Sequence, residues 1–259
     1  MRNHDGEITP PSALLLALEP RGIVFGVAGL LAAAPFLAFA PRGERHAVIV
    51  LPGFGATDRS TVAIRRYVGF LGYQAAGWNR GCNVRPAGAD IPAVVAQIRS
   101  LHDTTGTTVS LIGWSRGGII AREAARIPSD VVRMVITLGS PFAAPEATNV
   151  APVWRRITGE EFPAQTQEQS RRLATPLPVP STSIYTRSDG VVAWRACLEI
   201  EGSRRENVEV RGVHTGLGFN AAALWVIADR LAQPQDVWEP FRPTPLVTPF
   251  FPRAERRQA

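Results

Sequence analysis

A serine between two glycines is the first pattern in the sequence that could do chemistry. Gly113-Trp114-Ser115-Arg116-Gly117 has the form G-x-S-x-G and stands between a strand-like run, 107–112, and a helix-like run, 118–126. A tight turn from strand to helix places a serine oxygen at a helix N-terminus, where the helix dipole favours developing negative charge. This context predicts that Ser115 is a nucleophile, and the alternative is an ordinary serine in a glycine turn.

A serine hydroxyl is a weak nucleophile and needs a base. Of the four histidines, His4 lies in the N-terminal tail, His46 opens the first core strand, and His102 ends a helix. His214 instead follows the last predicted strand, in the glycine-rich stretch 211–218. Because parallel strands end at one edge of a sheet, His214 is expected to meet Ser115 there as the general base.

An acid that orients the histidine should follow another strand, between the serine and the histidine in chain order. Asp189 satisfies both conditions, since Ser188-Asp189-Gly190 comes directly after the strand-like run 183–187. The alternative is a turn-forming Asp-Gly pair. Glu199 and Glu201 are the other carboxylates considered for this role, but they lie later in the chain.

Two backbone N–H groups are needed to stabilise the oxyanion of a tetrahedral intermediate. Arg116, which follows the nucleophile, is expected to supply one of them. The other is expected from the loop 52–55 after the first core strand, with the Phe54 N–H as the best candidate.

These residues require a sheet that positions them. Short apolar runs alternate with helical patterns and predict an α/β fold, with a mainly parallel sheet flanked by helices. The predicted strands are 46–54, 73–78, 107–113, 131–139, 181–186 and 208–211, and the predicted helices are 58–71, 91–101, 117–126 and 221–231. Residues 141–180 interrupt this rhythm after the fourth strand and are expected to form an insertion with a helix near 165–173.

The two ends of the chain differ from the domain predicted over 46–232. Residues 1–45 form an N-terminal hydrophobic helical segment, in which 22–40 carry no charge. That stretch predicts either membrane association or a core-packing helix that Pro35 ends or kinks, and a cleaved signal peptide is the least favoured interpretation. The Pro-rich tail, 233–259, is expected to run extended over the domain.

Composition excludes several classes of function. The net charge of +6 comes entirely from arginine, and the absence of lysine excludes P-loop and Schiff-base chemistry. No run of arginines exceeds two, which disfavours nucleic acid as a partner. Cys82 and Cys197 are far apart in the chain and are expected to be buried free thiols, or a single disulfide if the protein is exported.

Taken together, the motifs resemble those of the α/β-hydrolases, and among them the small bacterial lipases and esterases. The resemblance spans about residues 47–231 and rests on five motifs: VLPGFG, GWSRGG, VITLGSP, SDGVV and VHTGLG. It implies hydrolysis of carboxylic esters through an acyl-serine, without a metal or organic cofactor. The chain departs from many lipases in having Trp114 and Pro52 where those enzymes carry histidine.

The resemblance implies a small-molecule ester or lipid as substrate. The expected location of the protein is cytoplasmic or membrane-associated, with export as the less favoured alternative. Phe54, Trp114 and Phe142 are expected either to line the acyl pocket or to belong to the core. Two other functions remain open at this point. One is an acyltransferase that uses the same Ser115, Asp189 and His214, and the other is a membrane-tethered binding module without turnover.

Overall fold

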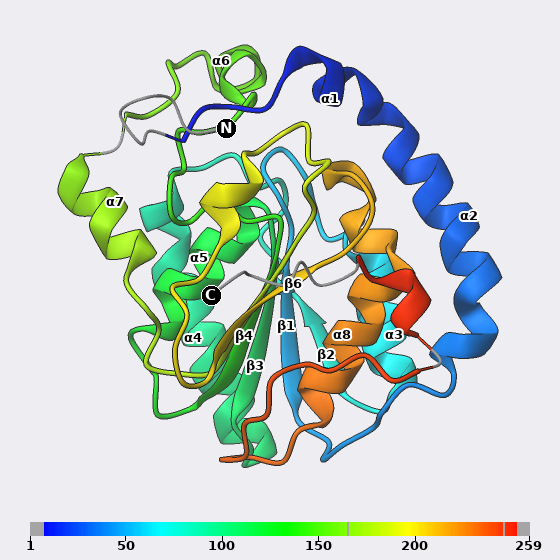
Figure 1. Cartoon of the computed structure of the whole chain (residues 1–259). Coiled ribbons are helices and arrows are strands. Elements are labelled where there is room, and N and C mark those ends of the chain that lie inside the picture. Colours follow the sequence, from blue (N-terminus) through cyan, green and yellow to red (C-terminus); the bar gives the residue numbers. More distant parts are fainter. Residues whose placement is uncertain (1–7, 165, 246, 253–259) are drawn as a thin grey trace.

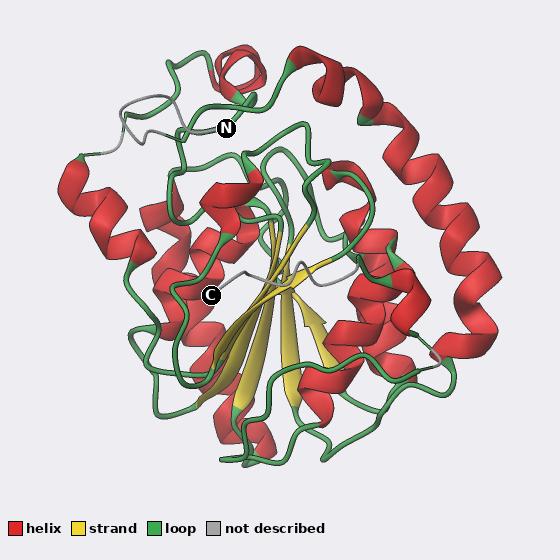
Figure 2. Ribbon diagram, in the orientation of Figure 1, coloured by secondary structure: helices red, strands yellow, loops and turns green. Residues whose placement is uncertain are grey.

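The computed structural model describes residues 8–164, 166–245 and 247–252, so His4 and the end of the predicted tail lie outside it. Its centre is a six-stranded sheet in which every pairing is parallel, with helices on both faces (Figures 1 and 2). The strand order is β2-β1-β3-β4-β5-β6. The predicted fold class is therefore confirmed. The strands are β1 Ala47–Leu51, β2 Gln74–Gly77, β3 Val109–Trp114, β4 Val132–Leu138, β5 Ser181–Tyr185 and β6 Arg205–Glu209.

Strand β1 shows why the central strands are apolar at every position. Val48 and Val50 belong to a core shared with α3 (Val62–Phe70) and α8 (Ala221–Ala232). The alternating residues Ala47, Ile49 and Leu51 belong to the opposite core, which is shared with α4 (Ala87–Thr105) and α5 (Arg116–Ala125). Successive side chains of a strand point to opposite faces, so a sheet covered on both sides needs apolar residues throughout.

The strand order reverses between β1 and β3. After β1 the chain moves outward to β2, and it then crosses back to β3, β4, β5 and β6. In open parallel sheets, ligands bind in the crevice outside the carboxyl ends of the strands at such a reversal. The loop after β1 and the turn after β3, which carry Phe54 and Ser115, flank this position.

Some predicted boundaries are wrong. β6 begins at Arg205 rather than at residue 208. Its first residues are charged and therefore lack the apolar pattern of the central strands, and Glu206 forms an ion pair with Arg230 of α8. The helix predicted from residue 58 begins at Val62. Residue Asp58 instead accepts hydrogen bonds from the backbone N–H groups at 78 and 79, at the end of β2. Helix α4 is longer than predicted at both ends.

The insertion after β4 contains two helices, α6 (Ala151–Thr158) and α7 (Gln167–Ala174). Helix α7 lies close to the predicted range, and Thr166 starts it with a reciprocal capping box to Gln169. Helix α6 was not predicted. It is short and lacks a side-chain cap, and its boundary signals are Pro152 in the first turn and Gly159 at the C-terminal end.

The N-terminal segment forms two helices, α1 (Ala13–Leu18) and α2 (Pro20–Leu37), which run along one flank of the molecule (Figure 1). Helix α2 contacts α8 and the short helix η2 (His214–Phe219), and Leu37 joins the main core. By length and composition α2 could also cross a membrane, and only 17% of it is buried. Pro35 lies inside the helix, two residues before its end.

The described part of the tail returns to the domain. A short helix, η3 (Thr248–Phe250), is flanked by Val247 and Phe251, which are buried in the core beside α8.

Another short helix, η1 (Trp194–Cys197), lies between β5 and β6. Both cysteines are free, but Cys82 is exposed rather than buried as predicted.

Candidate active site

Ser115 occupies a strained turn between β3 and α5. Its φ of 54° and ψ of −125° lie outside the regions that side chains other than glycine prefer. The flanking glycines make this turn possible, because a Cβ on Gly113 would collide with the backbone of Gly118, and a Cβ on Gly117 with the carbonyl groups that end β1. The turn therefore presents the serine at the start of α5, as its sequence context predicts.

Asp189 and His214 form a buried pair. Asp189 Oδ2 accepts a hydrogen bond of 2.7 Å from His214 Nδ1, and its Oδ1 accepts the N–H groups of Val191 and Val192 at 2.9 and 2.8 Å. Because an ionised carboxylate can only accept, Nδ1 carries the proton and Nε2 of the neutral ring is left with a lone pair. Glu199, one of the other carboxylates considered, instead pairs with buried Arg122.

The charge around His214 favours the protonated ring. Burial by itself lowers the pKa of His214, but the charge and hydrogen bond of Asp189 raise it, and the charge of Glu19 raises it further. The net effect is a pKa above the ordinary value of an imidazole. An imidazolium formed at this position is therefore stabilised.

The end of β4 brings the serine turn and the acid–base pair together. The Ser115 N–H donates to the Leu138 carbonyl at 2.8 Å. The next residue, Gly139, has a φ of +53°, and a Cβ there would lie 3.0 Å from His214 Nδ1 and 3.2 Å from Asp189 Oδ2. No hydrogen bond joins the Ser115 hydroxyl to the His214 ring among the described residues. Contacts of this kind often tighten only when substrate is present.

The two predicted oxyanion donors lie beside the serine. Arg116 is the first residue of α5, so its N–H has no carbonyl acceptor within the helix. In the described ranges no hydrogen bond uses the Phe54 N–H. A Cβ on Gly53 would lie 3.3 Å from the Cβ of Ser115, so the loop 52–55 reaches the nucleophile.

Asn83 holds this loop in place. Its side chain is fully buried and donates to the Pro52 carbonyl at 2.7 Å, and its backbone carbonyl accepts the Gly55 N–H at 2.9 Å. The Arg116 guanidinium donates to the Asn83 side chain and to the carbonyl of Arg85. One asparagine therefore links the loop 52–55 to the first residue after the serine.

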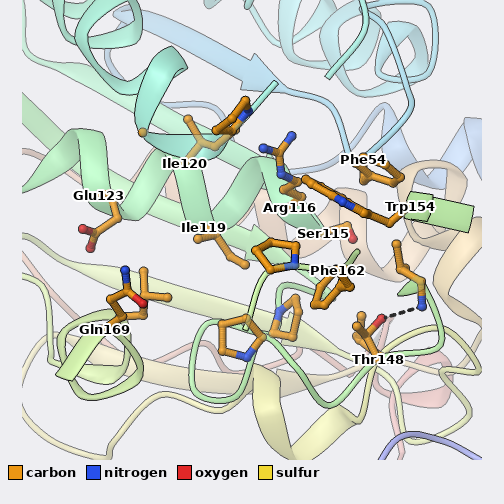
Figure 3. A pocket seen from close by; sticks show the side chains of 18 of the residues that line it. Phe54, Ser115, Arg116, Ile119, Ile120, Glu123, Thr148, Trp154, Phe162 and Gln169 are labelled. Atoms are coloured by element: carbon orange, nitrogen blue, oxygen red, sulfur yellow. Dashed lines mark hydrogen bonds between the residues drawn. The ribbon is translucent and has the colours of Figure 1, made fainter. Parts of the chain in front are cut away.

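A cavity of about 590 Å³ opens at Ser115. Phe54 and Trp154 stack with ring centroids 4.7 Å apart beside the serine, and Ile119 and Phe162 extend the apolar wall (Figure 3). Glu123 and Gln169 lie at the end remote from Ser115 (Figure 3). The cavity therefore has an apolar wall beside the serine and polar side chains at the remote end.

The three aromatic residues for which the sequence left pocket and core open divide between the two. Phe54 lines the cavity, but Trp114 and Phe142 do not. Trp114 packs against Gly218 and Phe219 of η2, the short helix that begins with His214. Phe142 is buried beneath the Arg122 guanidinium. Both belong to the packing that supports the site.

His46 and His102 have structural contacts away from the serine. His46 bonds to the Glu44 carbonyl and to Ser110, and His102 bonds to the Thr107 carbonyl. Within the described ranges, no three His, Cys, Asp or Glu side chains are grouped so that they could hold a metal ion.

The site also depends on residues that the sequence analysis missed. Asn83 lies in the loop between β2 and α4, and Trp154 lies on α6 in the insertion. Glu19 lies in the N-terminal segment, for which the sequence predicts membrane association, core packing or a signal peptide. Their importance arises from contacts with distant parts of the chain, for which a single sequence contains no periodic signal.

Comparison with known proteins agrees with this architecture. The family model of a PGAP1-like alpha/beta domain matches residues 91–184, which include Ser115 but neither Asp189 nor His214. No curated protein matches the sequence.

Several solved structures share the fold. Bacillus licheniformis lipase BlEst2 in its mature form is 16% identical, with a TM-score of 0.58 over 75% of this chain and 95% of that one. A structure of the metagenome-derived lipolytic enzymes LipS and LipT is 15% identical, with a TM-score of 0.56 over 74% and 94%. Aspergillus fumigatus lipase B is 19% identical, with a TM-score of 0.56 over 74% of this chain but 54% of its own. At these identities the likeness is one of fold, and the chain has the α/β-hydrolase fold.

Proposed function

We propose that the protein is a serine hydrolase that cleaves carboxylic esters through an acyl-serine intermediate. The observation that carries this proposal is the buried hydrogen bond between Asp189 and His214, next to the β4 end that also binds the backbone of Ser115. A hydroxyl, a carboxylate and an imidazole in this chain order are the parts of a Ser-His-Asp triad on an α/β-hydrolase sheet.

In the first half of the reaction, Ser115 Oγ attacks the ester carbonyl carbon and His214 Nε2 takes the hydroxyl proton. The negative charge that forms on the carbonyl oxygen is stabilised by the N–H groups of Phe54 and Arg116. The tetrahedral intermediate then collapses, the bond to the alcohol oxygen breaks, and the imidazolium gives its proton to the leaving alcohol. Asp189 stabilises the imidazolium throughout.

In the second half, His214 takes a proton from water while the water oxygen attacks the acyl-serine carbonyl. Collapse of this second intermediate breaks the bond to Ser115 Oγ, which recovers its proton from His214. The products are a carboxylic acid and the free enzyme. If an alcohol replaced the water, the same steps would give acyl transfer, so the triad serves both reactions.

The cavity favours an acyl chain as the group next to the serine. Its lining is mostly apolar, with Phe54, Ile119 and Trp154 among the wall residues. Burial of apolar surface contributes about 0.8 kcal/mol for each CH₂ group. The fold neighbours include proteins described as lipases and lipolytic enzymes. We therefore assign an ester or lipid with an apolar acyl chain as the substrate class.

The N-terminal helices supply a surface for membrane association. Nine of the seventeen exposed large apolar side chains of the described residues lie on 14–39, and Phe25 and Leu31 are 69% and 72% exposed. Clustered exposed apolar surface marks an interaction site. Because α2 packs along η2 and α8 on its other side, we propose that the helix pair lies on a lipid surface while the domain stays outside the bilayer.

A panel of p-nitrophenyl esters of different chain length tests the enzymatic proposal. Wild type is expected to hydrolyse them and to be labelled by a serine-directed fluorophosphonate, whereas Ser115→Ala is expected to lose both properties and to keep its fold. Turnover by Ser115→Ala at the wild-type rate would overturn the proposal. Added alcohols distinguish the acyltransferase, for which ester exchange would dominate over hydrolysis even in dilute alcohol.

Vesicle sedimentation tests the membrane proposal. Wild type is expected to sediment with phosphatidylcholine–phosphatidylglycerol vesicles, and the double variant Phe25→Ser, Leu31→Ser to stay in solution. Ile127→Ser, which replaces an apolar side chain of similar exposure on the domain, should bind as wild type does. Equal sedimentation of all three proteins would contradict this surface assignment.

A further inference from the structure

Glu19 lies between α1 and α2 and is only 4% exposed. Among the described residues no arginine or histidine forms an ion pair with its carboxylate. Its partners are backbone N–H groups: Oε1 accepts from Gly190 at 2.7 Å and from His214 at 3.0 Å, and Oε2 accepts from Thr215 at 2.8 Å. A buried carboxylate needs such compensation, because leaving it without partners costs several kcal/mol.

These N–H groups belong to the two loops that carry the acid–base pair. Gly190 follows Asp189 directly, and His214 supplies both the catalytic ring and one of the bonds to Glu19. Residues separated by about 170 to 200 positions in the sequence are therefore joined through one side chain. Any movement of Glu19 shifts the backbone on both sides of the 2.7 Å contact between Asp189 and His214.

The surrounding packing strengthens this link. The hydroxyl of Thr215 donates to the backbone carbonyl of Glu19 at 2.6 Å. A Cβ on Gly22 would collide with Val213 and Thr215, and a Cβ on Gly190 with the backbone of Leu15. The helix pair and the two loops are therefore in close contact at Gly22 and Gly190, without room for a side chain between them.

We propose that Glu19 is a positioning residue that holds the Asp189 and His214 loops in register, which makes the N-terminal helix pair part of the catalytic centre. This inference rests on the proposed serine hydrolase function. It assigns the segment 8–37 a role in turnover as well as a lipid-facing surface. A lipid surface that contacts the helix pair would then affect the geometry of Asp189 and His214 through Glu19.

The pKa of His214 is a readout that a change in loop packing alone would not shift. The charged groups acting on His214 are Asp189 at the ring and Glu19 behind the backbone, and both raise its pKa. The nearby thiol of Cys197 is buried, and its pKa is raised well above the ordinary value, so it is neutral at pH 7. Removal of the Glu19 charge should therefore lower the pKa of His214, even in a variant that folds normally.

Glu19→Gln is the decisive variant. The amide can still accept at one atom, but its NH₂ group opposes an N–H donor at the other. For a p-nitrophenyl ester, kcat is expected to fall about 10- to 100-fold with KM within twofold of wild type, because misplacement by about 1 Å costs this much. The acidic limb of the pH profile of kcat/KM should move to lower pH, because the pKa of His214 is lower.

Glu206→Gln is the matched control. This carboxylate also joins a distant segment to the sheet, since it accepts the Phe241 N–H at 2.6 Å and pairs with Arg230. It lies near the start of β6, at the N-terminal ends of the strands, whereas the site lies at their C-terminal ends. Its variant should lower the melting temperature and leave kcat and the acidic limb unchanged.

Glu19→Asp serves as the conservative variant, since it keeps the charge but shortens the reach. It is expected to lower kcat while the acidic limb stays near that of wild type, and it decides the question if Glu19→Gln does not fold. The inference is overturned if the Glu19 variant that folds keeps the wild-type kcat, or if Glu206→Gln shifts the acidic limb equally. Failure of the proposed function would look different, since Ser115→Ala would then remain active in the same assay.

Discussion

Nδ1 of His214 lies 2.7 Å from Oδ2 of Asp189, and the second oxygen of the same carboxylate accepts two backbone N–H groups. The carboxylate is therefore fixed by its own loop before it orients the ring. This arrangement leaves a single tautomer for the neutral imidazole, with Nε2 free of a proton. The catalysis that we propose for Ser115 depends on this tautomer.

Asp189→Asn should keep the fold and lose most of the activity. The amide can donate to Nδ1 and thereby stabilise the wrong tautomer, which in a Ser-His-Asp triad lowers kcat by about 10⁴-fold. Steady-state kinetics on a short p-nitrophenyl ester, with circular dichroism as the check on folding, measures the effect. A kcat within tenfold of wild type would exclude Asp189 as the orienting acid, and Glu199→Gln would then be the variant to test.

The pH dependence of kcat/KM should report His214. The ring must be neutral to act as a base, so activity is complete above its pKa and is lost as the pH falls through that value. Since Asp189 and Glu19 raise the pKa against the effect of burial, the midpoint of the acidic limb should lie above about 6.5, the ordinary value of an imidazole. A constant rate down to about pH 4 would contradict this role of His214.

The proposed catalytic residues could be selected from the sequence because each follows a strand. Ser115, Asp189 and His214 appear in chain order after strands whose apolar runs are visible in the sequence, and parallel strands end at one edge. Glu19 gave no such signal, because its partners Gly190 and His214 are 171 and 195 residues away. The position of a strand can be inferred from local pattern, whereas a contact between distant loops cannot.

The same distinction explains the errors in the fold. The central strands are buried on both faces, so their continuous apolar residues predict them. The edge strand β6 contains Arg205, Glu206 and Glu209, and its predicted start is three residues too late. Trp114 and Phe142 lie near the motifs, and the sequence leaves open whether they line the pocket or belong to the core. Proximity in sequence does not determine on which side of the backbone a side chain packs.

Ile119→Trp should shorten the acyl chain that the enzyme accepts. Ile119 lies one turn after Ser115 on α5 and lines the cavity, so a larger side chain occupies volume next to the nucleophile. We expect kcat/KM for an octanoyl ester to fall by about tenfold or more, since loss of two buried CH₂ groups corresponds to about 1.6 kcal/mol. The value for an acetyl ester should change by less.

Ile127→Trp is the control for this substitution. Residue 127 lies just beyond the end of α5, is exposed, and does not line the cavity. The measurement is the ratio of kcat/KM for octanoyl and acetyl esters in the three proteins. An unchanged ratio in Ile119→Trp would show that the acyl chain binds elsewhere.

Asn83→Ala should lower both stability and turnover. Loss of the side chain leaves the buried Pro52 carbonyl without its amide donor and removes one of the acceptors of the Arg116 guanidinium. An unsatisfied buried polar group costs about 1–3 kcal/mol. The loop 52–55 is then free to shift the Phe54 N–H away from the oxyanion, so kcat should fall while the acidic limb stays in place.

Asn207→Ala provides a matched control for Asn83→Ala. Asn207 also joins two segments, through bonds of 2.7 and 3.0 Å to the backbone of Glu199, but it belongs to β6. Its loss should destabilise the protein without a comparable fall in kcat. Equal falls in kcat in the two variants at a temperature where both are folded would contradict a specific role for Asn83.

His46 should make the protein less stable in mild acid. Its Nδ1–H donates to the Glu44 carbonyl at 2.9 Å, so Nε2 accepts from the Ser110 hydroxyl at 2.8 Å and the ring is neutral. Burial, with a smaller effect of Arg133, lowers the pKa of His46 to about 4, although the hydrogen bond to Glu44 opposes this shift.

The sign of this effect follows from proton binding. Above pH 6.5 the ring is neutral in both states and contributes no pH dependence. Between about 6.5 and 4 the unfolded chain binds a proton that the folded protein does not, so His46 lowers the unfolding free energy by up to about 3 kcal/mol as the pH falls. Urea unfolding of wild type and His46→Gln between pH 7.5 and pH 4 isolates this contribution, because His214 titrates in both proteins. The two stability curves should converge or cross toward pH 4, and parallel curves would show that His46 is not held neutral by the fold.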